Sequence, residues 1–374
     1  SPGHNVMAAS LTYYKDTITG DTVKSPWPYY GSNSGTSFAA PIVSGVCALI
    51  KSVNPCLTPE QVEEIIKLTA DPVNDENQYN GLLGAGRINA YQAVKYAQDN
   101  YGYEEYTIGY GQNITWTTEH QAKKITIYGG GKLTIKSTVY MLPGSDIIIE
   151  RGGELVIDEG YITTCKGLWN GIQVRGRIDE NQYTYTNQGH LTLIHGATIE
   201  NALIGAQTIK VDSSGTDPYS SGGIIQAVNA NFNNCITGVS FMPYENYLND
   251  KRNIKNNLSY LNNCNFRLDT NYNHVFNCPK QFVYMENVRG VSIKGCTFLN
   301  QIKSRDYEDV TQIDPDNMVG ITSLNSSFQV NEYCLSQTVP CDSTKPCLFE
   351  NLAYGIKAYN YGSEKFPYIN ESEF

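Results

Sequence analysis

The sequence lacks several features that would fix its class at once. No apolar run approaches the roughly 20 residues that cross a bilayer, because the longest, residues 41–50, is interrupted by Ser44 and Gly45. It has no run of lysine or arginine and its net charge is −10, so neither a membrane span nor a nucleic-acid partner is predicted. No Cys-x-x-Cys pair or Cys/His spacing suggests zinc. No cofactor is predicted, and a structural calcium ion stays open.

What is present favours strands and turns. Of the 374 residues, 40% are hydrophobic and only 17% are charged, which excludes wholesale disorder. The 28 tyrosines and 33 glycines argue against a coiled coil. The length corresponds to two or three domains. Because the chain begins at Ser1 without a methionine or a signal-peptide pattern, we expect it to be a piece of a longer protein.

The two halves of the chain differ in hydrophobic periodicity. Residues 37–99 carry helical patterns, whereas residues 107–360 carry short β-rich runs broken by Gly, Asn and Asp. We therefore predict a first domain over residues 1–99, a polar linker over residues 100–112 and a second domain over residues 113–374, truncated at its C-terminal end.

Three helices are predicted in the first half. One runs over about residues 37–52. A second is announced by residues 58–61 (TPEQ), in which the Thr is the N-cap, the Pro takes the first helical position and the Gln closes a capping box. A third begins at Asn89, with a glutamine three residues later.

The second half repeats itself. Residues 130–135 (GGKLTI) recur 22 residues later as residues 152–157 (GGELVI). Further on, a small residue precedes an apolar residue by two positions at seven places, with steps of 21 to 37 residues between them. These pairs are Gly160/Ile162, Ala197/Ile199, Ala230/Phe232, Cys264/Phe266, Cys296/Phe298, Ser326/Phe328 and Cys347/Phe349.

Such a repeat is typical of a solenoid, in which each coil buries its inner face against its neighbours. Asn and Gly follow Ile199, Phe232 and Phe349 at fixed offsets of two and six residues, which suits the corners between strands. The pattern resembles a right-handed parallel β-helix over roughly residues 113–360. Three of the ten cysteines share one coil position and are read as buried thiols, whereas Cys334 and Cys341 lie in a polar insertion and are the best candidates for a disulfide.

One short segment contains a candidate catalytic residue. Residues 35–41 (GTSFAAP) place Ser37 after a glycine at the start of a predicted helix. The hydroxyl of such a serine is exposed, and the unpaired N–H groups of the first turn can stabilise a developing oxyanion. Serine at a helix N-terminus is also a common cap, so the spacing alone leaves catalysis and capping both open.

The segment resembles the block around the nucleophile of the subtilisin-like serine peptidases, the subtilases, with Ser37 at the matching position. The resemblance extends to residues 1–3 (SPG), to the pair Thr58-Pro59 and to residues 84–90 (GAGRINA), and it covers residues 1 to about 97. It implies a partial α/β subtilisin-like domain, represented by its helical C-terminal portion. It also implies a serine endopeptidase activity on protein or peptide substrates.

In that family an Asp orients a His, the His accepts the serine proton and an Asn side chain completes the oxyanion hole. Family order places these three groups upstream of Ser1. None of the five histidines has a His-Gly-Thr-His context, so His4 is read as a loop residue and Asp16 and Asp21 as surface carboxylates. Because a serine hydroxyl needs an adjacent base, we expect this chain alone to be inactive and the full-length protein to be active.

The second half suggests no chemistry of its own, because its acids are scattered along the repeat. Five of its tyrosines could form an exposed wall that stacks on sugars, or could equally serve spacing and surface packing: Tyr183, Tyr185, Tyr244, Tyr247 and Tyr272. Two readings follow. In one, the β-helix positions a secreted endopeptidase on a surface or partner. In the other, an adhesin-like or glycan-binding stalk carries a vestigial peptidase region. Both place the protein outside the cell or on its surface.

Overall fold

The computed structural model describes residues 6–10, 13–15, 18–24, 29–73, 83–247, 253–272, 279–302, 318–336, 340–362, 367–369 and 372–373. The chain divides into two compact units, unit 1 (Ser1–Tyr103) and unit 2 (Glu104–Phe374). The predicted linker over residues 100–112 instead contains the last turn of a helix, α4 (Ala90–Tyr101), and a strand, β5 (Glu104–Ile108). Strand β5 pairs with β7 (His120–Ile127), so it belongs to the second unit.

Unit 1 is built around α1 (Thr36–Val53), α2 (Pro59–Leu68) and α4. The predicted capping box of α2 is present, with the Thr58 side chain and the Gln61 side chain each bonded to the other residue's backbone N–H. Asn89 caps α4 by accepting a hydrogen bond from the Gln92 N–H at 3.0 Å. Two antiparallel pairs precede α1, one of β1 (Val6–Ser10) with β4 (Tyr29–Asn33) and one of β2 (Tyr13–Lys15) with β3 (Thr22–Lys24).

The helices of unit 1 meet in a small cluster of buried side chains. Its members are Val46, Ile50, Leu57, Val62, Ile65, Ala93 and Ala97. By length and composition alone α1 is apolar enough to cross a membrane, but Val46 and Ile50 face this cluster. The sequence prediction of no membrane span rested on the short run over residues 41–50, and the helix is longer than that run at both ends.

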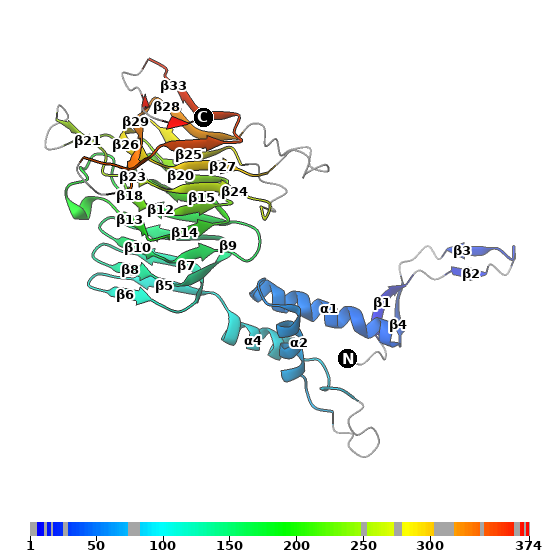
Figure 1. Ribbon diagram of the computed structural model, residues 1–374. Coiled ribbons are helices and arrows are strands. Elements are labelled where there is room, and N and C mark those ends of the chain that lie inside the picture. Colours follow the sequence, from blue (N-terminus) through cyan, green and yellow to red (C-terminus); the bar gives the residue numbers. More distant parts are fainter. Residues whose placement is uncertain are drawn as a thin grey trace. The chain divides into compact units, whose positions relative to one another are not determined.

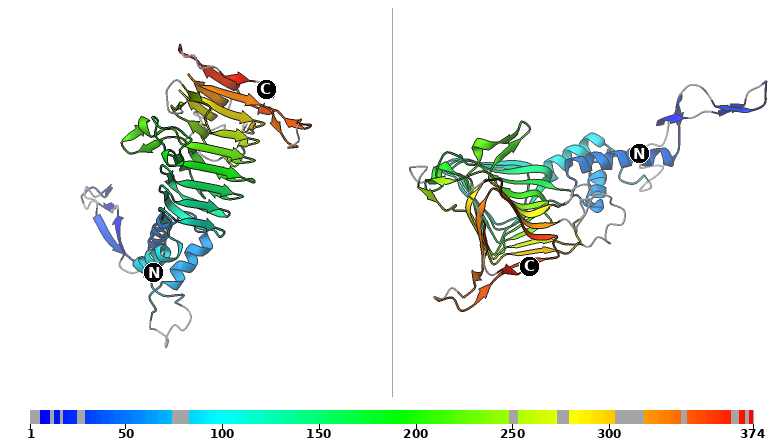
Figure 2. Two further views of the ribbon diagram at one scale, coloured as in Figure 1. Left: turned by 90° about the vertical axis from the view of Figure 1, so that its left-hand side faces the viewer. Right: turned by 90° about the horizontal axis from the view of Figure 1, so that it is seen from above.

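Unit 2 is a solenoid-like stack of parallel strands (Figure 1; Figure 2, left). One sheet has nine strands, in the order β34 (Tyr368–Ile369), β29 (Ser327–Asn331), β26 (Arg289–Lys294), β23 (Tyr260–Asn262), β18 (Ile224–Val228), β13 (His190–Ile194), β10 (Glu154–Asp158), β8 (Lys132–Ile135) and β6 (Asn113–Trp116).

The other large sheet has sixteen strands and forms two further walls of the stack. Both walls meet at β9 (Thr138–Ile149), whose first half pairs with β11 (Tyr161–Thr163) and whose second half pairs with β12 (Trp169–Val174). One wall continues through β14 (Thr198–Glu200), β19 (Asn231–Asn233), β24 (Asn265–Leu268), β27 (Thr297–Asn300), β32 (Cys347–Glu350) and β35 (Ser372–Glu373). The second continues through β15 (Ala202–Gln207), β20 (Thr237–Phe241), β25 (Gln281–Glu286), β28 (Val319–Leu324) and β33 (Tyr354–Tyr359). A coil thus takes one strand from each wall in turn.

Six of the seven predicted small/apolar pairs share one wall. Ile162, Ile199, Phe232, Phe266, Phe298 and Phe349 are in register through successive coils. Their last four rings form a stack, with centroids 4.8, 4.9 and 4.7 Å apart. The placement of Ser326/Phe328 was wrong, because Phe328 lies opposite Val291 in the nine-stranded sheet.

The corners of the coils depend on asparagine. Asn201, Asn234 and Asn351, each two residues after the apolar residue, have φ between 52° and 56°, the left-handed region that asparagine tolerates better than most residues. The glycine four positions later is required by close packing: a Cβ on Gly238 would lie 2.6 Å from the Phe266 ring. The two offsets in the sequence therefore correspond to a turn and to a ring contact.

The five cysteines that the sequence assigned behave as predicted. Cys264, Cys296 and Cys347 are free thiols and are fully buried, whereas Cys334 and Cys341 form a disulfide that closes a seven-residue separation. This disulfide lies in one of the antiparallel hairpins that interrupt the stack, formed by β30 (Tyr333–Cys334) and β31 (Thr344–Lys345). The other two hairpins join β16 (Lys210–Asp212) to β17 (Gly215–Asp217) and β21 (Asn246–Tyr247) to β22 (Ile254–Lys255).

Candidate active site

Ser37 is the second residue of α1 and its side chain is exposed. The residue before the helix, Gly35, has φ 153° and ψ 155°, a backbone conformation that is costly for any residue with a Cβ. Gly35 has no side chain with which to cap the helix, and its carbonyl accepts the Phe38 N–H at 3.1 Å. The sequence therefore positions an exposed hydroxyl at a helix N-terminus that has no side-chain cap.

Two further features shape the first turn. No acidic residue lies in it, so the positive end of the helix dipole is not neutralised by a neighbouring carboxylate. Pro41 lies inside the helix and has no N–H with which to bond the carbonyl of Ser37, four residues earlier. Pro41 therefore leaves the Ser37 carbonyl without its helical donor. The N–H groups of Thr36 and Ser37 at the helix start have no i−4 partner within the helix, and such donors suit a developing negative charge on a bound carbonyl oxygen.

Within the described part of the chain, no His or Asp side chain is hydrogen-bonded to Ser37. His4 and Asp16 lie outside the described residues, as do residues 1–3 and His274. Asp21 is exposed, and its N–H donates to the Thr19 hydroxyl at 3.4 Å. The expectation that the triad partners of Ser37 lie upstream of this chain stays a prediction.

The remaining three histidines have local partners in unit 2. His120 stacks on Trp116, with ring centroids 4.0 Å apart. His190 stacks on Tyr185 at 4.2 Å, and His195 Nδ1 lies 2.6 Å from an Asp158 carboxylate oxygen. Each imidazole is therefore engaged on the wall of the stack.

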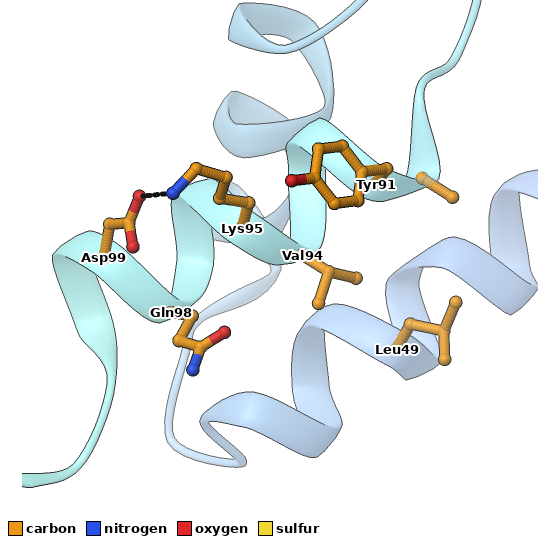
Figure 3. Close-up of a pocket in the computed structure, with 7 residues that line it drawn as sticks. Leu49, Tyr91, Val94, Lys95, Gln98 and Asp99 are labelled. Carbon is orange, nitrogen blue, oxygen red and sulfur yellow. Dashed lines mark hydrogen bonds and ion pairs between the residues drawn. The ribbon is translucent and has the colours of Figure 1, made fainter.

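The helix that carries Ser37 is only partly covered by described residues. A surface groove of about 620 Å³ lies between α1 and α4 (Figure 3). In this groove Leu49 faces Tyr91 and Val94, and the Lys95–Asp99 ion pair lies at one side. A second, almost wholly apolar groove of about 460 Å³ lies between α1 and α2. Ile42 and Leu49 are exposed along the same helix. Such an apolar surface is typical of a helix whose neighbours in a larger core are missing.

The predicted exposure of the tyrosine wall is only partly confirmed. Tyr183 and Tyr185 are exposed, but Tyr244 and Tyr272 are 2% and 1% exposed and belong to the core of the stack. A single sequence position does not reveal on which side of a coil a tyrosine lies when a loop interrupts the repeat. Trp169, another aromatic residue of the stack, is fully buried and donates its indole N–H to the Glu200 carbonyl at 2.8 Å.

Comparison with known proteins concerns unit 1 above all. Residues 1–103 match the sequence profile of the Subtilase family. Bacillopeptidase F of Bacillus subtilis is 30% identical over 142 residues, which are 37% of this chain and 9% of that protein. Serine protease AprX of the same organism is 45% identical over 65 residues, 17% of this chain and 14% of that protein. The Extracellular serine protease of Serratia marcescens is 31% identical over 125 residues, 33% of this chain and 10% of that protein.

These relatives are much longer than the matched segments, because the chain spans only 9% to 14% of the length of these three. A solved structure, the Streptococcus pneumoniae surface protein and adhesin PfbA, aligns over 76% of this chain and 97% of its own, at 10% identity and a TM-score of 0.15. That similarity is too low to carry an argument. Residues 1–103 are similar to the Subtilase family, and Ser37 lies inside the matched segment.

Proposed function

We propose that this chain is part of a secreted serine endopeptidase in which Ser37 is the nucleophile. The observation that carries the proposal is the exposed Ser37 hydroxyl at the uncapped N-terminus of α1, inside the segment that matches the Subtilase family. The Asp, the His and the oxyanion Asn are contributed by polypeptide upstream of residue 1. All curated relatives reported above are proteases by name.

The proposed reaction follows from this geometry. The upstream His takes the Ser37 proton as the serine oxygen attacks the peptide carbonyl, and the resulting oxyanion is held by the Ser37 N–H and the Asn side chain. The His returns the proton to the leaving amine, and an acyl group stays on the serine oxygen. Water, deprotonated by the same His, then releases the acid and restores the serine.

The chain by itself supplies the nucleophile and half of the oxyanion hole. A serine hydroxyl without a neighbouring base is a poor nucleophile at neutral pH. We therefore propose that the 374-residue chain has no peptidase activity and that the full-length protein has.

Unit 2 is proposed to be a right-handed parallel β-helix that positions the peptidase on a surface or partner. The name of the Serratia marcescens relative, an extracellular protease, and the low charge content of the chain support an extracellular or cell-surface location.

A fluorophosphonate probe tests the assignment of Ser37. The full-length protein should be labelled and should digest an unstructured protein, whereas Ser37→Ala should abolish both. Ser44→Ala is the matched control, since Ser44 is an exposed serine of the same helix whose hydroxyl bonds the Ala40 carbonyl at 3.1 Å. The 374-residue chain should not be labelled.

Three results would contradict the proposal. Labelling that survives Ser37→Ala would move the nucleophile elsewhere, and labelling of the 374-residue chain would mean that its base is local. No labelling of the full-length protein would favour the second function, an adhesin-like or glycan-binding protein with a vestigial peptidase region. That function is favoured by the nature of the exposed apolar side chains of unit 2, most of which are tyrosines.

A further inference from the structure

The outer face of the nine-stranded sheet carries two similar rows of charged side chains. The strand register places Glu154 of β10 between Lys132 of β8 and His190 of β13. Four residues further along β10, Asp158 pairs with Lys136, the residue after β8, at 2.5 Å and with His195, the residue after β13, at 2.6 Å. Each row therefore consists of a lysine, a carboxylate and a histidine from three neighbouring coils.

The floor between the two rows is flat and mostly hydroxylated. Thr134, Val156 and Thr192 occupy it, two residues along each strand from the first row, and Thr115 and Gln226 extend it on either side. Four residues of extended strand separate the rows by about 13 Å. Since every side chain here points outward from a rigid sheet, the spacing of the polar groups is fixed by the backbone.

An aromatic ring stands at one end of this face. Tyr185 is 48% exposed, its ring is stacked on His190 with an angle of 11° between the planes, and its hydroxyl donates to Glu154 at 2.8 Å. Glu154 also accepts from the Lys132 ammonium at 2.9 Å. His190 therefore covers one face of the Tyr185 ring and Glu154 holds its hydroxyl, while much of the ring surface stays exposed.

The loop that carries Tyr185 is held by the hydrogen bonds of a buried glutamine. Gln188 is fully buried and bonds the backbone of the same loop three times, accepting from the Arg177 N–H at 2.9 Å and donating to the Arg177 and Glu180 carbonyls at 3.0 and 2.9 Å. A ligand would therefore meet a ring that is already ordered, which lowers the entropic cost of binding.

The chemistry of the face selects a ligand. An open tyrosine ring beside hydrogen-bond donors and acceptors suits a molecule with one apolar face and a rim of hydroxyls. The two lysines are matched by the two carboxylates, so the face offers no net charge to a polyanion. Its only aliphatic side chains are the half-buried Val156 and Ile194, which leaves no large anchor for a protein interface.

We propose that this face of β8, β10 and β13 binds a neutral polysaccharide, with one pyranose ring on Tyr185. The Lys132 ammonium and the Glu154 carboxylate bond its hydroxyls. The glycan runs along the strands towards the second row, where His195 is 64% exposed. Its Nδ1–H donates to Asp158, so its Nε2 is the acceptor for a further hydroxyl. This inference does not depend on the role of Ser37.

Affinity electrophoresis of the 374-residue chain tests the proposal, with gels that contain a neutral β-glucan, xylan or mannan, or anionic polygalacturonate. At least one neutral gel should retard the chain, and Tyr185→Ala should weaken that retention about tenfold or more, as for the loss of one stacking contact. Tyr185→Phe should keep most of it. Tyr361→Ala is the matched control, because Tyr361 is 72% exposed and lies far along the chain.

Several outcomes would overturn the proposal. These are no retention in any neutral gel, retention by polygalacturonate alone, or equal retention of the wild type and Tyr185→Ala. A loss of retention in Tyr361→Ala as large as in Tyr185→Ala would place the binding site elsewhere. Circular dichroism and the thermal midpoint of each variant separate a lost contact from lost folding, and if Tyr185→Ala fails to fold, Lys132→Ala replaces it with the same expected direction.

Discussion

The two units expose different kinds of apolar side chain. In the described part of unit 1 six of the seven exposed large hydrophobics are aliphatic, namely Ile18, Ile42, Leu49, Leu68, Val73 and Leu83, beside Tyr91. In unit 2 nine of twelve are tyrosines: Tyr110, Tyr128, Tyr183, Tyr185, Tyr219, Tyr354, Tyr359, Tyr361 and Tyr368. A tyrosine keeps its hydroxyl in water while its ring is available, whereas an exposed leucine gains nothing until something covers it. Among the described residues, the first surface suits burial against further polypeptide and the second suits reversible contacts.

The two units also differ in the extent of their buried cores. In the part of the chain that the structure describes, unit 1 has one small cluster of buried side chains, whereas a single continuous cluster runs through the stack of unit 2. Coils of a solenoid stabilise one another through nearest-neighbour contacts. We therefore expect the stability of the 374-residue chain to come mainly from unit 2.

The largest effect should come from the ring stack of unit 2. Phe266 is fully buried between Phe232 and Phe298, so Phe266→Ala should lower the free energy of unfolding by about 3–5 kcal/mol. Urea unfolding followed by circular dichroism measures this loss. Tyr361→Ala, at an exposed tyrosine, should stay within about 0.5 kcal/mol. A similar loss in both variants would contradict the assignment of the core.

Hydrogen exchange should separate the two units next. We expect the amides of α1 to exchange at least about a hundredfold faster than those of β10, equivalent to about 2.7 kcal/mol in local opening free energy. Mass spectrometry of the 374-residue chain measures both peptides together. Equal protection of α1 and β10 would break the comparison between the units.

A corner of the stack should respond less strongly. Asn234 has φ 52°, and its side chain both donates to the Asp269 carboxylate and accepts the Asp269 N–H, each at 3.0 Å. Asn234→Ala should cost about 1–2 kcal/mol from the left-handed backbone alone. Asn234→Gly removes the same bonds without that penalty, so it should cost less in the same unfolding experiment. If glycine is the more damaging change, the turn conformation is not what asparagine supplies.

The smallest effect should be a pH dependence at His190. Burial lowers the pKa of this imidazole below its usual value, so below about pH 6.5 the unfolded chain binds the proton more readily than the folded one. The contribution of His190 to the free energy of unfolding should be fully present above about pH 6.5 and should fall as the pH drops towards the lowered pKa. Thermal midpoints of the wild type and His190→Gln between pH 5 and 8 test this, and the variant should show the flatter curve.

Much of the local structure could be predicted, for identifiable reasons. The α2 capping box and the Asn corners depend on residues a few positions apart in the sequence, and the Phe positions follow from the recurring small/apolar pair. Ser326/Phe328 was misplaced because the strand that this coil contributes to the nine-stranded sheet, β29, carries the same small/apolar spacing as the Phe wall. The coil from Phe298 to Phe349 is also lengthened by the β30/β31 hairpin, so the next residue of the Phe wall comes later than the repeat predicts. The polar rows were missed, although the 22-residue repeat already set Lys132 opposite Glu154. The signal available in the sequence was a pair of oppositely charged residues, Lys132 and Glu154, at the same position of two successive repeats.

The candidate nucleophile could be predicted for a different reason. Ser37 follows from a short motif whose glycine, helix start and proline are neighbours in the chain, and each is where the motif places it. The partners of a catalytic serine are distant in sequence and meet it only through the fold, so no local pattern around Ser37 identifies them.

Parallel pairing through successive coils has a mechanical consequence. Adding or deleting one whole coil moves everything beyond it by a single strand spacing of about 4.8 Å and leaves the remaining coils with unchanged neighbours. The length of unit 2 can therefore be changed in fixed steps, by evolution or by design, without altering the coils at either end.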